Sequence, residues 1–388
     1  MPRIKVAHIV TKLEWGGAQQ NTLHTVRTLN RDFFDAHLIC GPGGILDGEA
    51  GRDGVPVEFV SALQRAVHPV KDAAAFFQLR RLLRRLRPDI VHTHSSKAGI
   101  LGRWAASAAG VPVVVHTFHG FGFHPAQPAP VRAAYVAVER WTARLSTALI
   151  AVSRANRDEA LARGIGRPDQ YHLIRSGVPL APYRSLASRR DAPPGIVLGA
   201  EEKLVTTIGP FKPQKNLKDF LRAAAAVLQR RRDVKFLVIG DGDGRVRLEE
   251  EIRRRGLADH VVLAGWRRDV PALLARTDAF CMTSLWEGLP RSLVEAMAAG
   301  RPCVVNAVDG CRDLIDDGVN GFLVPPRHPL TTAERLLQIL ADDDLAFLLG
   351  RRARETIGDE FDIDGMVRAQ ERLYSALWSA RTPKTSPA

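Results

Sequence analysis

The chain has 388 residues, of which 45% are hydrophobic and 25% are charged, so it is too long for one ordinary core and has the balance of a globular, soluble protein. The formal net charge of +13 permits nucleic acid, an anionic membrane surface or a phosphorylated ligand as a partner. Aromatic residues make up only 6% of the chain and no nucleic-acid motif is visible, so we expect no nucleic-acid partner.

Short apolar segments alternate with amphipathic segments in the first half of the chain, beginning with Ile4–Val10. That run is too short for a secretory or membrane-spanning segment, and we interpret it as the first strand. We predict strands near 4–10, 36–40, 56–60, 89–93, 112–117, 147–152 and 171–174, and helices near 17–30, 70–87, 97–109, 130–145 and 154–163. This alternation predicts a parallel sheet with helices on both faces, which is an α/β fold.

A stretch rich in Pro, Arg and Ala, residues 178–194, lacks periodicity and is interpreted as a linker. A second α/β set follows, with strands near 203–208, 234–239, 261–264, 278–282, 302–305 and 321–324 and final helices near 331–341, 344–357 and 362–379. We therefore predict an N-terminal domain over 1–180 and a C-terminal domain over 195–360. The polar end, 381–388, is expected to be disordered.

Metal-ligand spacing is missing among the cysteines and histidines. The four cysteines show no C-x-x-C pattern, and we expect reduced thiols, with Cys40 and Cys303 in the core. Histidines are unusually dense in one region: His92, His94, His116, His119 and His124. His92 and His94 face the same side of a predicted strand, but no carboxylate or Cys accompanies them at ligand spacing, so we predict no metal and no cofactor.

The segment 286–300 carries two carboxylates, Glu287 and Glu295, across a loop-to-helix junction. Pro290 suits the first turn of the helix and Gly300 suits its end. We place Glu295 about two turns into the helix, and its Cα–Cβ bond tilts back toward the helix N-terminus. That end favours phosphate through free N–H groups and the helix dipole. The segment therefore offers the parts needed to hold a nucleotide-sugar.

This segment resembles the E-x7-E signature of the family-4 retaining glycosyltransferases, and four other segments resemble that family in chain order. They are the glycine pair of 16–19, the segments 92–99 and 116–120 of cell-surface polysaccharide members, and the glycine–cation–cation loop 208–216. Together they span most of residues 4–325. The resemblance implies GT-B architecture, with two Rossmann-like domains facing across a cleft. The N-terminal domain would bind the acceptor, the C-terminal domain would bind the nucleotide-sugar, and helix 362–379 would cross back to the N-terminal domain.

The resemblance implies two catalytic residues, Glu287 and His119. Glu287 would contact a hydroxyl of the donor sugar and stabilise an oxocarbenium-like transition state. His119 follows a predicted strand and would contact the donor sugar near the reaction centre. The alternative interpretations are a carboxylate that complements a helix dipole and an ordinary loop histidine that caps backbone.

The remaining donor-binding residues come from both domains. Glu295 would accept hydrogen bonds from ribose hydroxyls, and Lys215 matches the cation that binds the leaving diphosphate. Lys212 would replace the family's first cation, because Pro210 stands where the family has Arg. Both lysines are otherwise read as solvated turn residues. The rest of the predicted donor set is Gly16, Gly17, Trp266, Arg267, Gly288, Leu289, Pro290, Arg291 and Ser292.

Two further segments are less specific. His94, Ser95, Ser96 and Lys97 are candidates for recognising the acceptor. Gly240–Gly244 has the spacing G-x-G-x-G and no acid at the position that would hold a ribose, so we interpret it as a tight turn rather than a dinucleotide fingerprint. Asp241 and Asp243 within it match a DXD metal motif by letter, but they lie on a different loop.

Five arginines mark the predicted helix around 76–87, opposite a stripe formed by Phe76, Leu79, Leu82, Leu83 and Leu86. It is either a core-packed helix with a solvated basic face or a surface that docks on anionic lipid. We expect a cytoplasmic protein, peripheral at the inner face of the membrane.

The predicted activity is retaining, metal-independent transfer of a sugar from a nucleotide diphosphate to a lipid-linked glycan of a cell-surface polysaccharide. The same fold also permits a sugar-nucleotide epimerase or a non-catalytic, membrane-associated binding protein.

Overall fold

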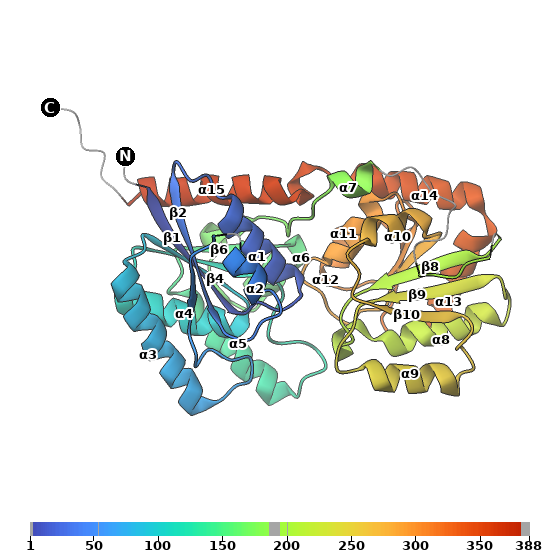
Figure 1. Ribbon diagram of the computed structural model, residues 1–388, viewed down its shortest axis with the longest axis horizontal. Coiled ribbons are helices and arrows are strands. Elements are labelled where there is room, and N and C mark those ends of the chain that lie inside the picture. Colours follow the sequence, from blue (N-terminus) through green and yellow to red (C-terminus); the bar gives the residue numbers. More distant parts are fainter. Residues whose placement is uncertain (1–2, 53, 186–194, 200, 382–388) are drawn as a thin grey trace. The chain divides into compact units, whose positions relative to one another are not determined.

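The computed structural model describes residues 3–52, 54–185, 195–199 and 201–381 (Figure 1). The chain forms two units, one with residues 1–177 and 363–388 and the other with residues 178–362. The division lies close to the boundaries expected at 180 and 360, and the last helix belongs to the first unit. Residues 186–194 of the expected linker and 382–388 of the expected tail lie outside the described residues.

The first unit is built on a parallel sheet with the strand order β3-β2-β1-β4-β5-β6-β7. The strands are β1 (Ile4–Lys12), β2 (Phe34–Gly41), β3 (Val57–Phe59), β4 (Ile90–His94), β5 (Val113–Phe118), β6 (Ala148–Ala151) and β7 (Tyr171–Leu173). Each predicted strand of this half is present and displaced by at most a few residues. The apolar runs of β4, β5 and β6 are buried throughout, as strands covered on both faces should be.

Helices cover both faces of this sheet. They are α1 (Gly17–Thr28), α2 (Asp47–Arg52), α3 (Pro69–Leu86), α4 (Ser96–Ala109), α5 (Ala129–Ala143), α6 (Arg154–Ala162) and α15 (Ile363–Ser379). Residues of α15 and α1 share one core with alternate residues of the strands, and α3 and α4 share another with the residues between them. The α2 turn was not predicted.

The second unit is built on a parallel sheet with the order β10-β9-β8-β11-β12-β13. The strands are β8 (Lys203–Ile208), β9 (Val234–Ile239), β10 (Val261–Gly265), β11 (Ala279–Met282), β12 (Cys303–Asn306) and β13 (Phe322–Val324). The helices are α7 (Ala181–Arg184), α8 (Leu217–Leu228), α9 (Arg245–Arg254), α10 (Val270–Arg276), α11 (Arg291–Ala298), α12 (Asp309–Arg312), α13 (Pro329–Ala341) and α14 (Asp343–Thr356).

Alternate strand residues of the second unit pack against different helices. Val205 and Phe236 lie in one core with α8 and α13, whereas Leu204 and Leu237 lie in another with Leu273 of α10. All four cysteines are buried and free, and Cys40 and Cys303 are core residues as expected. The two cores fix the sheet from both sides, so the loops after the strands start from rigid positions.

Both sheets contain a point at which the strand order reverses. In the first unit the chain leaves β1 toward β2 on one side, and later reaches β4 on the other side. In the second unit β8 has β9 on one side and β11 on the other. Ligands of open α/β sheets bind at such points, beyond the carboxyl ends of the strands.

Candidate active site

The reversal point of the second unit is occupied by an ion pair between two predicted site residues. Lys215 ends a short 3-10 turn (Pro213–Lys215) after β8, and Glu287 lies in the loop after β11. The Lys215 Nζ atom is 2.5 Å from Glu287 Oε1, and the two side chains are only 13% and 7% exposed. The pair places a cation and a carboxylate side by side where a ligand of this sheet would bind.

Glu287 is also held by neighbours that the sequence did not indicate. Gln214 Nε2 donates to Glu287 Oε2 at 3.3 Å and to the carbonyl oxygen of Trp286 at 2.8 Å. The Glu287 N–H donates to Asp309 Oδ2 at 2.9 Å. Both the carboxylate and the backbone of Glu287 are therefore fixed before any ligand arrives, which is the preorganisation that an electrostatic site requires.

Gly310 allows the loop that carries Glu287 to approach α12 closely. A Cβ atom at Gly310 would lie 2.0 Å from the carbonyl oxygen of Gly288, a distance that no side chain tolerates. Asp309, which precedes it, has a positive φ of 22°. The only signal in the sequence for these residues is an Asp-Gly pair shortly after a strand, which is common at turns.

The helix α11 begins one residue later than predicted. Pro290 is the N-cap, with φ −75° and ψ 102°, and the helix starts at Arg291. Glu295 therefore lies just over one turn into the helix, and the expected two turns were wrong. Gly300 follows the C-cap with a φ of 68°, as a helix-terminating glycine should.

Glu295 is partly buried in α11, and this burial raises the pKa of its carboxyl, with Arg291 opposing the shift. Tyr183 of α7 is buried as well, and its pKa is raised by burial and then by the charge of Glu295. A partly buried carboxylate near the start of a helix, next to a phenol and a guanidinium, is suited to accept hydrogen bonds from a polyol. Leu289 and Leu293 beside it are buried, while Ser292 is partly exposed.

The other predicted donor residues of this unit follow β8 and β10. Lys212 is exposed at the N-cap of the 3-10 turn. Trp266 is 39% exposed, and Arg267 beside it donates to both carboxylate oxygens of Asp269, at 2.7 and 2.6 Å. Lys212 and Trp266 are thus both exposed, and the guanidinium of Arg267 pairs with a neighbouring carboxylate.

The segment 240–244 forms a turn, as its spacing predicts. Gly240 has a φ of 136°, and a Cβ there would lie 2.0 Å from the carbonyl oxygen of Gly209. Asp241 accepts from Arg245 Nε at 2.9 Å and from Arg245 Nη2 at 3.1 Å, which lowers the pKa of its carboxyl. The Asp241 carboxylate is therefore engaged by Arg245, the first residue of α9.

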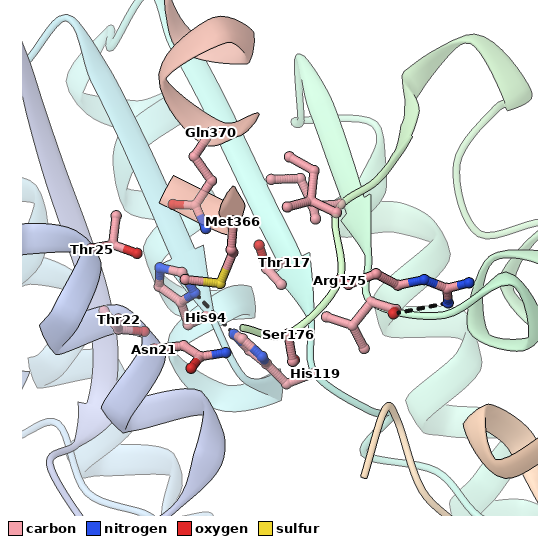
Figure 2. Close-up of a pocket in the computed structure, with 13 residues that line it drawn as sticks. Asn21, Thr22, Thr25, His94, Thr117, His119, Arg175, Ser176, Met366 and Gln370 are labelled. Carbon is pink, nitrogen blue, oxygen red and sulfur yellow. Dashed lines mark hydrogen bonds between the residues drawn. The ribbon is translucent and has the colours of Figure 1, made fainter. Parts of the chain in front are cut away.

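The reversal point of the first unit gathers the predicted glycines and histidines. Gly16 is the N-cap of α1 and Gly17 is its first residue. His94 ends β4, and His119 follows β5. Figure 2 shows a pocket in this region, lined among others by Asn21, His94, His119, Arg175, Met366 and Gln370. Sequence reasoning did not identify Asn21, Arg175 or the two residues of α15.

His119 is hydrogen-bonded to the buried interior of the sheet. His119 Nε2 lies 3.1 Å from His94 Nδ1, and His94 Nε2 lies 3.0 Å from His8 Nδ1. His8 is fully buried and His94 is 2% exposed. Burial lowers the pKa of His8 to about 3 and lowers the pKa of His94 well below its ordinary value, with nearby histidines contributing. Both rings are therefore neutral near pH 7.

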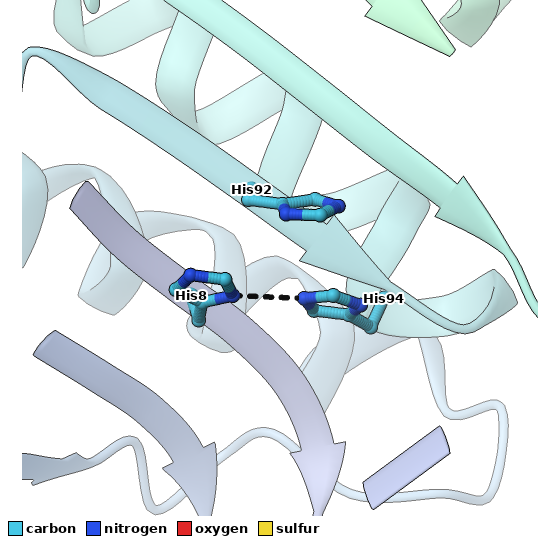
Figure 3. Close-up of side chains that lie close together, drawn as sticks. All are labelled: His8, His92 and His94. Carbon is cyan, nitrogen blue, oxygen red and sulfur yellow. Dashed lines mark hydrogen bonds between the residues drawn. The ribbon is translucent and has the colours of Figure 1, made fainter. Parts of the chain in front are cut away.

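His8, His92 and His94 form a cluster (Figure 3), in which one ring nitrogen of each histidine lies within 4.8 Å of one nitrogen of each of the others. The expected common orientation of His92 and His94 is present, and β1–β4 pairing sets His8 opposite His92. Both nitrogens of His92 are engaged, by Tyr374 at 2.5 Å and Thr117 at 2.7 Å. His92 could bind a metal ion only if one of these hydrogen bonds were broken, and the absence of a metal stays a prediction.

The remaining predicted acceptor residues start α4. Ser95 has a positive φ of 65° and is the N-cap, and Ser96 is the first helical residue. Lys97 Nζ lies 2.5 Å from Asp72 Oδ1, and its side chain is 14% exposed. A role for Lys97 in binding the acceptor stays a prediction, and it would require this ion pair to open.

The basic helix is α3, with the predicted stripe turned inward. Leu79 and Leu83 are buried, whereas Arg81, Arg84, Arg85 and Arg87 are exposed. Phe77 on the same helix is 60% exposed. None of the helices in the described part of the chain combines the length and the apolar run that a membrane crossing requires.

Comparison with known proteins agrees with both halves of the fold. Residues 16–177 match the family model of the glycosyl transferase 4-like domain, and residues 189–356 match that of glycosyl transferases group 1. The UDP-Gal:alpha-D-GlcNAc-diphosphoundecaprenol alpha-1,3-galactosyltransferase of Escherichia coli is 32% identical over 376 residues, covering 96% of this chain and 97% of the relative. The putative glycosyltransferase EpsD of Bacillus subtilis is 27% identical, covering 88% and 90%.

Solved structures share the architecture at lower identity. The Anabaena protein HepE, in complex with UDP and glucose, superposes with a TM-score of 0.80 at 22% identity, covering 96% of this chain and 100% of that one. Sucrose-phosphate synthase of Thermosynechococcus elongatus gives a TM-score of 0.82 at 20% identity, covering 97% and 100%. The predicted α/β fold with two Rossmann-like domains is confirmed. The chain therefore belongs to the glycosyltransferases with the GT-B fold, and among them to the type that builds bacterial polysaccharides.

Proposed function

We propose that this chain transfers a sugar from a uridine diphosphate sugar to a glycan carried on a polyprenyl diphosphate, with retention of the anomeric configuration. The observation that carries the proposal is the Lys215–Glu287 pair at the reversal point of the second sheet, with its nitrogen and oxygen 2.5 Å apart. The choice of uridine and of a lipid-linked acceptor is supported by the Escherichia coli relative, whose name specifies both.

The two charges suit the two sites at which charge develops. Lys215 stabilises the diphosphate as it leaves with the bonding electrons, and the N-terminus of α11 adds its dipole. Glu287 stabilises positive charge at the anomeric carbon. Glu295 accepts hydrogen bonds from the ribose hydroxyls of the donor. In this mechanism the departing phosphate takes the proton of the acceptor hydroxyl, which attacks from the face that the phosphate leaves.

Metal independence is part of the proposal. Lys215 and the start of α11 supply the positive potential that a divalent cation would otherwise provide. Lys212 is accessible to add a second cation.

Membrane contact belongs to the same proposal, because a polyprenyl-linked acceptor is confined to a bilayer. The exposed arginines of α3 and the exposed Phe77 provide a basic, partly apolar surface on the first unit. Such a surface is attracted to anionic lipid by about 1 kcal/mol for each basic residue. This attraction would hold the protein at the inner face of the membrane.

The test is product analysis with and without acceptor. The purified protein is incubated with UDP-, GDP-, ADP- and dTDP-sugars and with GlcNAc-diphosphate on a short polyprenyl chain. We expect transfer from a UDP-sugar, an α-linked product from an α-linked donor, and thermal stabilisation by UDP. Conversion of the donor in the absence of acceptor would instead establish an epimerase, and UDP stabilisation without any turnover would establish a binding protein.

A further inference from the structure

Three imidazoles form a continuous hydrogen-bonded chain from the core of the first unit to its pocket. His8 lies on β1, His94 ends β4 and His119 follows β5. The links are His8 Nδ1 to His94 Nε2 at 3.0 Å and His94 Nδ1 to His119 Nε2 at 3.1 Å (Figures 2 and 3). His8 and His94 are buried, and His119 is partly exposed and lines the pocket.

Only two proton arrangements satisfy both links. A neutral imidazole carries one N–H and one acceptor nitrogen. If His8 donates from Nδ1, then His94 accepts at Nε2 and donates from Nδ1, and His119 accepts at Nε2. If every link is reversed, His8 carries its proton on Nε2 and His119 donates from Nε2.

The end of the chain at His8 distinguishes these arrangements. His8 Nε2 is buried and has no hydrogen-bond partner among the described residues. The reversed arrangement would put an N–H there, and buried N–H groups without an acceptor are rarer than under-satisfied acceptors. The structure assigns His8 and His94 as positioning residues that hold His119 in the neutral tautomer with its proton on Nδ1.

The neighbouring histidine does not disturb this chain. Tyr374 OH donates to Gln370 Oε1 at 3.2 Å, so it accepts from His92 Nδ1. His92 Nε2 then accepts from the hydroxyl of Thr117 at 2.7 Å. His92 is therefore satisfied by its own partners, and it provides a buried histidine on β4 that makes no hydrogen bond to His119 or His94.

The fixed tautomer defines what His119 presents to a ligand. This step rests on the proposed function and extends it with a contact between His119 and a hydroxyl of the donor sugar. A ring whose Nε2 accepts from His94 offers an uncharged Nδ1–H, so it recognises the oxygen of that hydroxyl as an acceptor. The reversed tautomer would offer only a lone pair and would require the hydroxyl to donate. The direction of this hydrogen bond is thus set by His8, two rings away.

The tautomer is measured directly in the resting protein, without substrate. Histidine labelled with ¹⁵N gives different ring-nitrogen shifts for protonated and unprotonated nitrogens, and His119→Gln assigns the signals. We expect His119 with Nδ1 protonated and Nε2 unprotonated. A His119 that is protonated on Nε2 overturns the proposal. His8→Leu removes the donor that orients the chain, and the His119 signals should then shift toward a mixture of tautomers.

Kinetics separate positioning from simple support of the fold. His94→Leu should lower kcat roughly tenfold or more because the ring loses its orienting partner, with UDP affinity unchanged. His94→Asn places an amide donor near the former Nδ1 atom and should recover most of that loss. His92→Phe is the matched control: it loses buried hydrogen bonds on the same strand but should leave the His119 tautomer intact. Equal effects of His94→Leu, His94→Asn and His92→Phe on kcat and on the melting temperature overturn the proposal.

The two proposals fail separately. If the protein transfers no sugar but His119 shows the expected tautomer, the proposed activity is wrong and the proposed histidine chain stands. If the protein transfers sugar but His119 is protonated on Nε2, the proposed activity stands and the proposed histidine chain is wrong.

Discussion

Lys215 and Glu287 meet at 2.5 Å although 72 residues separate them in the chain. The side chains come from the loops after β8 and β11, the two neighbouring strands at which the order of the second sheet reverses. A diphosphate sugar bound there would have to share Lys215 with Glu287. The resting pair therefore keeps two opposite charges neutralised, side by side, until the ligand arrives.

Separating this pair should affect stability and transfer differently. Lys215→Met leaves a buried carboxylate without its cation and should destabilise the protein by about 3 kcal/mol. Glu287→Gln and the double variant remove that charge, so the double variant should be more stable than the sum of the single changes predicts. Transfer, measured as kcat/KM, should fall by about a hundredfold or more in each single variant, and it should not recover in the double.

Lys203 provides the control for this cycle. It begins β8, the strand before the turn that carries Lys215, and its Nζ atom lies 3.0 Å from the exposed Asp343 and 3.7 Å from Asp278. Lys203→Met should change stability by less than about 1 kcal/mol and leave kcat/KM unchanged. Recovery of transfer in the double variant would show that the Lys215–Glu287 ion pair has only a structural role.

Glu295→Gln should maintain or increase the stability of the ligand-free protein and should weaken nucleotide binding. Burial raises the pKa of Glu295, so the folded chain binds more protons than the unfolded chain as pH rises above the ordinary value for Glu. Folding stability contributed by this group therefore falls as pH increases through that range, and the amide removes the penalty. The melting temperature at pH 7.5 should rise or stay constant, whereas UDP affinity should fall about tenfold or more.

The exposed Glu355 of α14 is the matched control for this substitution. Glu355→Gln should change neither UDP affinity nor the melting temperature. A Glu295→Gln protein that binds UDP as tightly as the parent would show that Glu295 does not contact the nucleotide.

Acid should unfold the first unit because its buried histidines are neutral. Burial lowers the pKa of His8 to about 3 and lowers the pKa values of His92, His94 and His116 well below the usual value. Below pH 6.5 the unfolded chain takes up protons that the folded chain does not. Stability is thus lost as pH falls, by about 1.4 kcal/mol per pH unit for each such histidine.

Urea unfolding between pH 7.5 and 5.5 checks this slope. His116 shares a 2.9 Å hydrogen bond with Thr93, and His116→Asn keeps an amide near that residue. This variant should reduce the slope of the unfolding free energy against pH by the contribution of one histidine. His328→Gln, at an exposed position, should leave the slope unchanged. A stability that does not depend on pH over this range would contradict the neutral, buried state of the four rings.

How far the sequence predicts this molecule depends on the range of the interactions. Strand and helix positions were predictable because apolar periodicity is local, and Lys215, Glu287 and Glu295 lie in recognisable motifs. The contacts of Gln214 and Asp309 with Glu287 join three segments that lie far apart in the chain, and no local pattern indicates them. His8 was missed for the same reason: its link to His94 follows from the pairing of β1 with β4.

The basic face of α3 should bind anionic vesicles if it docks on the membrane. Arg81 and Arg84 are exposed on α3, and replacing both by Glu should weaken co-sedimentation with phosphatidylglycerol vesicles by roughly 30-fold or more at low salt. The exposed Arg247 and Arg253 of α9 allow a charge-matched control in the second unit. Equal weakening by both pairs would show a general effect of net charge rather than a docking face.

Transfer should withstand removal of divalent metal. The leaving diphosphate is stabilised in our proposal by Lys215 and by the N-terminus of α11, and these charges remain after chelation. Both carboxylate oxygens of Asp241, the first acid of the DXD-like segment, accept hydrogen bonds from Arg245. Activity should therefore be constant when EDTA is titrated above the total metal, with EDTA already saturated by magnesium as the control. If EDTA abolishes activity and manganese restores it, a metal ion rather than Lys215 neutralises the leaving diphosphate. Lys215→Met should then have little effect on kcat.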